Sequence, residues 1–346
     1  MSLEFRHIAH SYGQNRALED VSFTAPKGEI TCLLGSSGCG KSTLLNLAAG
    51  LLPVQHGSIH LDGELLAGNG SFPPPEKRPI GLVFQDGALF PHMNIADNVG
   101  FGLQKNGDWA GLVDGWLNTV GLAGLGKRFP HQLSGGQQQR AALARAMATQ
   151  PHVLLMDEPF ASVDIVLRRS LRRECRTLLR ERGATTILVT HDPDEALDVA
   201  DNIAVMEAGQ IVQFGSPQEL HQNPVSASVG AIFHGAQVVA GKHLDGGIET
   251  AFGMWPKDSI AGDFPADLPD GCDFDLLVHA SEFEVEADTG TLIVRDFRPN
   301  GSGAAMVVAG DNGAELTIAC DPAFKIAAGS RVQAMPKIAS IRAFKA

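Results

Sequence analysis

Paired cysteines, an excess of basic charge and long apolar runs are all missing from this 346-residue sequence. The five cysteines are scattered with no C-x-x-C pair, so we expect neither a zinc site nor a disulfide framework, and a reducing compartment fits best. Acidic residues outnumber basic ones by 39 to 27, and the formal charge of −12 argues against a general nucleic-acid binder. No apolar run reaches the length of a membrane span, and residues 1–7 contain no apolar h-region, so we expect no signal peptide. Work at a membrane would therefore need a partner.

The clearest feature that is present is a glycine-rich loop between an apolar strand at 30–34 and a helix that starts near Thr43. Its eight residues fit the pattern G-x-x-x-x-G-K-S: Gly35, Ser36, Ser37, Gly38, Cys39, Gly40, Lys41 and Ser42. Such a loop points backbone N–H groups at a triphosphate, and the helix N-terminus adds its positive end. Lys41 can reach the β- and γ-phosphates, and the Ser42 hydroxyl can ligate Mg²⁺. The loop predicts nucleotide binding without separating kinases, GTPases and ATPases.

Two adjacent carboxylates end the apolar run at 153–156. The run predicts a central parallel strand that is buried on both faces. Burying two carboxylates without a reason is costly, so Asp157 and Glu158 point to chemistry at the strand's carboxyl end. Asp157 can hold Mg²⁺ through water, and Glu158 can accept a proton from the water that attacks the γ-phosphate. The alternative is a pair of solvated loop acids.

Polar residues also follow two other predicted strands, at 80–84 and 185–190. Gln85 ends the first, where it can reach a metal or an attacking water; a loop glutamine bonded to the backbone is the alternative. His191 ends the second, where it can donate a hydrogen bond to a γ-phosphate oxygen. Because the carboxyl ends of strands in an open α/β sheet share one crevice, both residues are candidates for the same site.

A second glycine-containing motif opens the helix predicted at 138–149: Leu133, Ser134, Gly135, Gly136 and Gln137. Ser134 is predicted to be its N-cap. Two glycines at a helix start permit close approach by a phosphate, which the helix dipole favours. An ordinary cap with flexible glycines is the alternative.

Tyr12, the single tyrosine, precedes the glycine-rich loop and could either stack on a purine or be an ordinary half-buried aromatic.

Asp164 precedes a predicted helix with one apolar face, formed by Leu167, Leu171, Cys175, Leu178 and Leu179. The opposite face is rich in arginine. Since no aromatic residues are interleaved, we expect a solvated face rather than a nucleic-acid groove.

The remaining segments suggest two domains. Residues 3–8 are predicted to be an edge strand. Helices are expected at 95–103 and 112–120 beside an apolar patch at 89–93, which is either a docking surface or packed within its own segment.

After about residue 235 the helical periodicity fades. The alternation at 282–288, a turn at Thr289–Gly290 and later strands at 291–294, 305–308, 314–319 and 331–334 predict a small antiparallel β domain, with its glutamates facing solvent.

Taken in order, these motifs resemble the nucleotide-binding subunit of an ABC transporter: Tyr12, residues 35–42, Gln85, residues 133–137, residues 156–158, Asp164 and His191. The resemblance covers about residues 1–235 and implies a P-loop α/β fold with a RecA-like core, a helical subdomain at about 86–150, and an OB-like, TOBE-type β domain at 236–346. The segment Ala161-Ser162-Val163-Asp164 departs from the family's usual Ser-Ala-Leu-Asp but retains the aspartate.

The resemblance also implies a mechanism. Two subunits pair head to tail with ATP and Mg²⁺ between the residue 35–42 loop of one and Ser134–Gln137 of the other. Glu158 is then the general base, His191 the γ-phosphate sensor, and Gln85 the link to a membrane permease that docks at about 86–105. The chain would lie on the cytoplasmic face of the plasma membrane, served indirectly by an external solute-binding protein.

The cargo is indicated only by similarity within the family. The β domain, together with Leu89–His92 and the loop Pro74–Arg78, is similar to import ATPases that serve ferric iron, polyamines, sulfate or molybdate. Residues 81–92 with Phe233–Ala236 are most similar to the ferric iron subgroup. Import of another solute, including phosphonate, is the alternative. A non-transport ABC ATPase is a further one, although the long coiled coils, zinc hooks or second ATPase unit of that class are not visible.

Overall fold

The computed structural model describes the chain except for residues 86, 106, 162, 234–235, 246, 262–268, 301–302, 311, 322–323, 325 and 346. Contacts divide the chain into two units, Met1–Leu220 and His221–Ala346. The sequence placed this division at 235/236, where residue 235 and the motif residue His234 lie outside the described residues. The division comes earlier because α8 (Ala227–Ile232) packs on strands of the second unit.

A six-stranded sheet with the order β10-β9-β3-β8-β7-β6 forms the centre of the first unit. Its strands are β3 (Ile30–Leu34), β6 (Ile80–Val83), β7 (Val153–Asp157), β8 (Thr185–Thr190), β9 (Asn202–Glu207) and β10 (Gln210–Gly215). Only β10 runs antiparallel to its neighbour. Every residue of β3 and β8 is buried, as expected for parallel strands covered on both faces. The predicted α/β class is confirmed, and β7 is a parallel strand between β8 and β6, one position in from the end of the sheet.

A four-stranded antiparallel sheet with the order β2-β1-β4-β5 completes the unit. Its strands are β1 (Leu3–Tyr12), β2 (Asn15–Ala25), β4 (His56–Leu61) and β5 (Glu64–Gly68). The prediction of an edge strand at 3–8 is wrong, because β1 pairs with both β2 and β4. Its polar residues alternate with buried ones since one face packs on the core while the other meets water.

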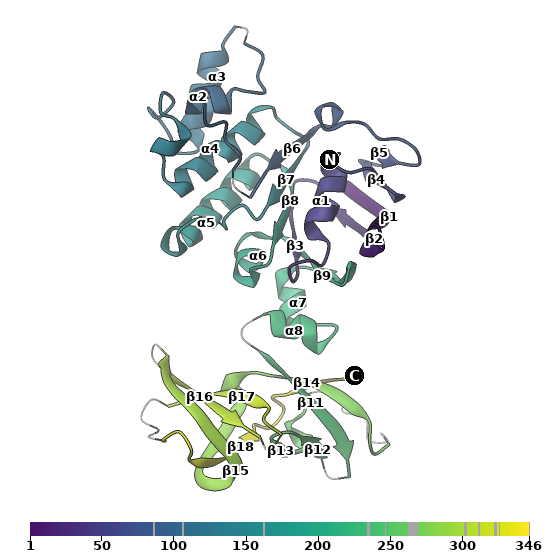
Figure 1. Ribbon diagram of the computed structural model, residues 1–346, viewed down its shortest axis with the longest axis vertical. Helices are drawn as coiled ribbons and strands as arrows, with labels where there is room; N and C mark the ends of the chain where they lie inside the picture. The colour runs from purple at the N-terminus through teal and green to yellow at the C-terminus, as the bar shows by residue number, and fades with distance from the viewer. Residues whose placement is uncertain are drawn as a thin grey trace. The chain divides into compact units, whose positions relative to one another are not determined.

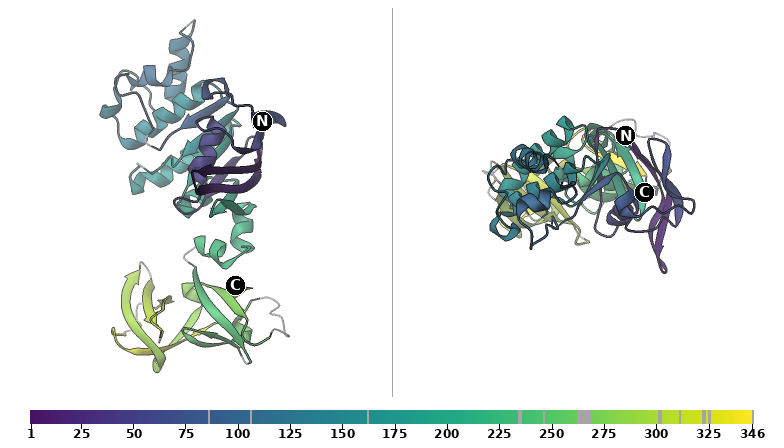
Figure 2. Two further views of the ribbon diagram at one scale, coloured as in Figure 1. Left: turned by 45° about the vertical axis from the view of Figure 1, so that its right-hand side comes forward. Right: turned by 90° about the horizontal axis from the view of Figure 1, so that it is seen from above.

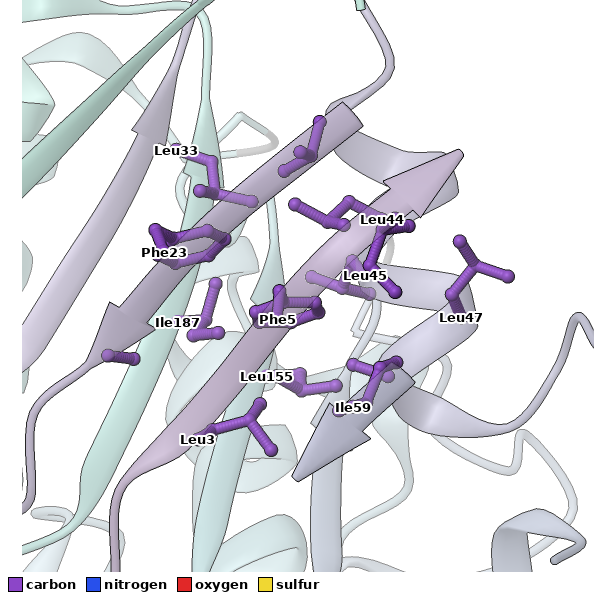
Figure 3. Packing of buried hydrophobic residues seen from close by; sticks show 14 of the residues in the cluster. Leu3, Phe5, Phe23, Leu33, Leu44, Leu45, Leu47, Ile59, Leu155 and Ile187 are labelled. Atoms are coloured by element: carbon purple, nitrogen blue, oxygen red, sulfur yellow. The ribbon is translucent and has the colours of Figure 1, made fainter. Parts of the chain in front are cut away.

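The main core of this unit joins both sheets to α1 (Lys41–Ala49). Figure 3 shows Phe5 of β1 and Phe23 of β2 beside Leu44 and Leu45 of α1, with Leu155 of β7 in the same cluster. The two phenyl rings are stacked with centroids 4.7 Å apart. The helix that follows the glycine-rich loop is therefore fixed by apolar packing on its buried face.

The helices α4 (Gly135–Ala148), α5 (Ile165–Glu181) and α6 (Pro193–Val199) lie beside the central sheet, with α4 against β6 and α6 against β3 and β8 (Figures 1 and 2). The helices α2 (Ile95–Val99) and α3 (Trp109–Thr119) pack on α4 instead. The helix α7 (Pro217–Gln222) and the 3₁₀ turns η1 (Pro75–Lys77) and η2 (Pro130–Gln132) complete the set. The helix expected at 95–103 ends at Gly100, where a Cβ would lie 2.4 Å from the Trp109 ring. The Trp109 indole N–H donates to the Gly100 carbonyl at 3.2 Å, a tertiary contact that local periodicity does not reveal.

The second unit is built from strands, as predicted. One sheet has the order β13-β12-β11-β14-β19 and the other β17-β16-β15-β18; Figure 2 shows them as separate layers. The strands are β11 (Gln237–Leu244), β12 (Gly247–Thr250), β13 (Gly253–Pro256), β14 (Asp273–Val278), β15 (Phe283–Asn300), β16 (Gly303–Ala309), β17 (Glu315–Cys320), β18 (Arg331–Pro336) and β19 (Arg342–Lys345), with the turns η3 (Lys257–Ser259) and η4 (Ala280–Glu282).

The turn predicted at Thr289–Gly290 is wrong, because β15 continues through it. Ala287 and Leu292 both pair with Val332, so the intervening residues form a bulge, and Gly290 takes a φ of 77° there. Across the described residues of both units, no helix is long and apolar enough to span a membrane.

Candidate functional site

The glycine-rich loop joins the buried strand β3 to α1 and depends on two glycines with positive φ. Gly38 has a φ of 86° and Gly40 a φ of 106°. A Cβ on Gly40 would lie 2.5 Å from the Ala17 carbonyl oxygen, so no larger residue fits without displacing backbone. Glycine at position 40 therefore lets the loop lie against the Ala17 backbone. In this position the free N–H groups at the start of α1 can bind an anion.

Lys41, the first residue of α1, folds back over this loop. Its Nζ donates to the carbonyls of Gly35 at 2.8 Å and Ser36 at 2.9 Å, and the side chain is only 6% exposed. The ammonium group is thereby held above the loop's backbone at the start of the helix. This position suits a cation that pairs with the phosphates of a bound nucleotide.

Ser42 and Asp157, which are 115 residues apart in sequence, meet at the end of β7. The Ser42 hydroxyl donates to Asp157 Oδ1 at 3.3 Å. Burial raises the pKa of Asp157, while the Ser42 bond lowers it. A hydroxyl and a carboxylate oxygen are hard ligands of the type that Mg²⁺ prefers, so this pair fits the cation beside the phosphates.

Glu158 and His191 come together from the ends of the neighbouring strands β7 and β8. Glu158 Oε1 and His191 Nδ1 are 3.0 Å apart. Glu158 has a φ of 42° and donates its N–H to the Val189 carbonyl at 2.9 Å, which turns its side chain out of the strand direction. A cavity of about 290 Å³ adjoins both side chains. The pair can therefore reach a molecule at the sheet edge.

A buried charge network that the sequence analysis missed lies behind His191. Glu195 is 4% exposed and accepts from the Thr190 hydroxyl at 2.9 Å, while Arg172 lies 3.7 Å from it and also pairs with Asp192. Burial raises the pKa of Glu195 from its ordinary value of 4.5 to about 7, against the opposing effects of the Thr190 bond and Arg172. The expectation that the arginines of α5 form a solvated face is wrong for Arg172, whose partners follow the next strand and are not visible in local periodicity.

Two other candidates lie at the surface. Gln85 follows β6 and is exposed. Because Val83 pairs with Met156 in the parallel neighbour β7, Gln85 and Asp157 both lie at the carboxyl ends of their strands. Tyr12 ends β1, is 49% exposed, and meets the buried His10 ring edge-on at 4.9 Å.

Ser134 caps α4 as predicted. The Ser134 hydroxyl accepts from the Gln137 N–H at 3.4 Å, and the Gln137 side chain accepts from the Ser134 N–H at 3.0 Å. This capping box leaves Gly135 exposed and Gly136 partly exposed. Among the described residues, no hydrogen bond or ion pair joins residues 133–137 to the loop at 35–42.

Asp164 is exposed and begins α5, where its carbonyl accepts from the N–H groups of Leu167 and Arg168. The neighbouring Ser162, part of the segment that departs from the family pattern, lies outside the described residues. Leu167 was expected on the apolar face of this helix, but its side chain is 54% exposed. The buried face begins one turn later, at Leu171.

Known proteins are similar to this chain in sequence. The family model for "ABC transporter" fits residues 18–161. The chain is 47% identical to the Fe(3+) ions import ATP-binding protein FbpC of Pseudomonas fluorescens over 249 residues, which cover 71% of this chain and 70% of that protein. The chain belongs to the ABC transporter ATP-binding family. Its fold and its ATPase chemistry are those of that family.

The names of two other relatives of this ABC ATPase mention different transported solutes, Fe(3+) ions and sulfate/thiosulfate. FbpC of Mesorhizobium japonicum is 46% identical, covering 75% of this chain and 72% of that protein. The sulfate/thiosulfate import ATP-binding protein CysA 2 of Chromobacterium violaceum is 44% identical, covering 76% of this chain and 71% of that protein.

Solved structures resemble the ATPase part of the chain. CbiO1 from Clostridium perfringens, described as part of the ABC transporter complex cbiONQ, matches with a TM-score of 0.58 and 30% identity, covering 64% of this chain and 90% of that chain. An ATP-binding cassette in a dimeric post-hydrolysis state bound to ADP and Pi matches with a TM-score of 0.54 and 27% identity, covering 62% of this chain and 98% of that chain.

Proposed function

We propose that this protein is the ATP-hydrolysing subunit of an import system that drives ferric iron uptake through a membrane permease. The observation that carries the proposal is the convergence of Ser42, Asp157, Glu158 and His191 on one edge of the central sheet, beside the glycine-rich loop. Glu158 accepts the proton of the attacking water, and His191 donates to the γ-phosphate. Lys41 pairs with the phosphates of ATP.

Ser42, Asp157 and Gln85 are the proposed Mg²⁺ ligands, with Asp157 acting through water. When bound, the cation neutralises charge on the β- and γ-phosphates. The donors are oxygen atoms of a hydroxyl, a carboxylate and an amide, which suits a hard cation. Tyr12 is proposed to stack on the adenine, and Thr43 follows the loop at the phosphate-facing end of α1.

We further propose a head-to-tail homodimer. Ser134–Gln137 forms an exposed helix N-terminus that is separate from the residue 35–42 loop, so a second copy must supply the facing half. Asp164 lies at the exposed start of α5 and would join the same interface. A dimeric relative bound to ADP and Pi supports the proposal of a dimer.

The proposed permease docking surface is the segment at about 86–105, of which residue 86 lies outside the described residues. Asn98 is fully buried and holds the apolar loop in place, donating to the carbonyls of Phe90 at 3.1 Å and Met93 at 3.1 Å. Phe90 packs on Phe101 with centroids 4.5 Å apart, yet Phe101 remains 57% exposed. A rigid loop next to an exposed phenyl ring suits the docking of a partner helix.

The proposed location follows from the partner: the ATPase lies on the cytoplasmic face of the plasma membrane, and a solute-binding protein outside delivers the cargo to the permease. The second unit is proposed to be an accessory or regulatory β domain. No nucleic-acid partner is proposed.

The test is uptake of radiolabelled ferric iron, sulfate and putrescine by intact cells that carry one variant as the sole copy. Glu158→Gln should abolish iron uptake, whereas Glu76→Gln, a change in an exposed carboxylate of η1, should not. Loss of sulfate or putrescine uptake alone would replace the cargo and keep the mechanism. Unchanged uptake of all three would overturn the proposal.

A further inference from the structure

The single tyrosine of the chain, Tyr12, lies at the tip of the hairpin that joins β1 to β2. It ends β1 and pairs with Asn15, and Gly13 and Gln14 form the turn between the strands. Such exposed tips are ordinarily among the more mobile parts of a fold. A ring that must stack on a ligand from a mobile tip loses freedom when it binds, and this loss weakens binding unless neighbouring residues already hold the ring in place.

The side chain of Gln55 holds the backbone immediately before Tyr12. Its Oε1 accepts from the Ser11 N–H at 2.8 Å, and its Nε2 donates to the Ser11 carbonyl at 3.1 Å. The backbone ladder between β1 and β4 ends at the pair of Ala9 and His56. Facing residues of an antiparallel ladder exchange the same two kinds of bond through their backbone groups. The Gln55 amide therefore adds one further rung beyond β4 and ties the hairpin tip to that strand.

The ring of His10 packs against the ring of Tyr12. His10 is 4% exposed, and the two rings meet edge-on with centroids 4.9 Å apart and an angle of 71° between their planes. Aromatic rings favour this geometry, because the positive edge of one ring then faces the negative face of the other. The Nδ1 atom of His10 has no hydrogen-bond partner in the part of the chain that the structure describes, so a hydrogen bond through this atom does not account for the buried imidazole. The contact with Tyr12 gives it a role.

We propose that His10 and Gln55 are positioning residues that fix Tyr12 for the adenine before ATP binds. This inference rests on the proposed stacking of Tyr12 on the base. His10 holds the ring through an aromatic contact, and Gln55 holds the backbone one residue earlier. Because both act through Tyr12, they strengthen binding of the base and leave binding of the phosphates unchanged. Prior ordering of a contact residue raises affinity without adding a new contact.

NMR of the nucleotide-free, full-length protein tests whether Tyr12 is held in advance. Because the chain has one tyrosine, ¹⁵N-tyrosine labelling gives a single backbone amide signal. We expect an order parameter of about 0.85, which is typical of rigid backbone, and a lower value in Gln55→Met. The matched control is Gln237→Met, because Gln237 exchanges the same two bonds with the Thr317 backbone in the second unit, each at 2.8 Å. An order parameter that Gln55→Met leaves unchanged would overturn the proposal.

Calorimetry with two ligands separates the base from the phosphates: AMP-PNP, a non-hydrolysable ATP analogue, and inorganic tripolyphosphate. Gln55→Met and His10→Leu should each weaken AMP-PNP binding by about threefold to tenfold, the size expected for loss of an edge-on aromatic contact, and should change tripolyphosphate binding by less than about twofold. His10→Phe keeps a ring and should bind AMP-PNP as the wild type does. Equal losses for the two ligands would show general damage to the nucleotide site and would overturn the proposal.

A Tyr12→Ala background tests whether the two residues act through Tyr12. This change alone should weaken AMP-PNP binding at least about fivefold, since it removes a base-stacking ring. Adding Gln55→Met or His10→Leu should then cost less than about twofold, because no ring is left to position. Full losses in this background would overturn the proposal. Normal AMP-PNP affinity in Tyr12→Ala would overturn the stacking itself, whereas a loss in Tyr12→Ala with none in Gln55→Met or His10→Leu would overturn only the positioning.

Discussion

Glu158 Oε1 and His191 Nδ1 lie 3.0 Å apart, although 33 residues separate them in sequence. The contact exists because β7 and β8 are parallel neighbours, with Asp157 opposite Val189. Glu158 adopts a φ of 42°, which non-glycine residues rarely take and which points to a functional constraint at this position. The pair therefore joins the proposed proton acceptor to the proposed sensor of the γ-phosphate.

Glu158→Gln should slow ATP hydrolysis by about 100-fold or more while leaving ATP binding intact. An amide keeps the shape and the contact with His191 but cannot accept the proton of the attacking water, and general-base catalysis typically contributes about 10²–10⁴-fold. Phosphate release measures the rate, and a fluorescent ATP analogue measures binding. Lys41→Ala is the contrasting variant, which should lose ATP affinity; normal turnover in Glu158→Gln would disprove the base assignment.

Ser42→Ala should raise the Mg²⁺ concentration needed for half-maximal hydrolysis by at least about tenfold, since loss of a group that ligates or orients a metal's ligands commonly costs that much. The change removes the hydroxyl that donates to Asp157 at 3.3 Å. A Mg²⁺ titration of the ATPase rate measures the effect. Ser42→Thr, which keeps the hydroxyl, should behave like the wild type, and an unchanged requirement in Ser42→Ala would exclude Ser42 from the metal site.

The parts of the candidate site that could be predicted from the sequence are those that a short, local residue pattern identifies. The loop at 35–42 and the cap at Ser134 depend on spacing over a few residues, and the carboxylates at 157–158 end a recognisable apolar run. The central strands could be predicted because burial on both faces makes them continuously apolar.

The features that the sequence did not predict depend on distant contacts. The pairing of β1 with both β2 and β4, the end of α2 at Gly100 and the burial of Arg172 are each decided by partners elsewhere in the chain. Leu167 fits the helical period of its neighbours but lies beyond the surface that α5 buries. Periodicity shows which face is apolar, and only packing shows where that face ends.

Gly40→Ala should destabilise the protein more than Gly13→Ala. Both glycines have positive φ, 106° and 60°, so each substitution carries a backbone strain of up to about 1–3 kcal/mol. Only at Gly40 does the new Cβ meet backbone, 2.5 Å from the Ala17 oxygen, whereas none lies within 4 Å at Gly13. Urea denaturation without nucleotide measures the free energy of unfolding; equal losses would contradict the proposed close approach.

Leu179→Ala should cost about 2–5 kcal/mol of folding free energy, because it leaves a cavity in a site that is fully buried. Leu167→Ala on the same helix should change stability by about 0.5 kcal/mol or less, because the side chain is 54% exposed. The two variants share the same substitution and the same helical background. Equal costs in urea denaturation would mean that Leu167 is covered in solution, for example by the proposed dimer.

The buried carboxyl of Glu195 should make stability depend on pH. Burial raises its pKa from 4.5 to about 7, so between these values the native state keeps a proton that the unfolded state has lost. Because the unfolded state then binds fewer protons, the free energy of unfolding falls as pH rises through this window.

Glu195→Gln removes this titration and keeps an oxygen that can accept from the Thr190 hydroxyl, which donates to Glu195 at 2.9 Å. The difference between pKa values of 4.5 and about 7 corresponds to about 3 kcal/mol. Wild type should therefore lose about that much stability relative to the variant between pH 4.5 and pH 7. Urea denaturation at a series of pH values measures both proteins, and parallel curves would show that Glu195 is already ionised in the native state, held by Arg172.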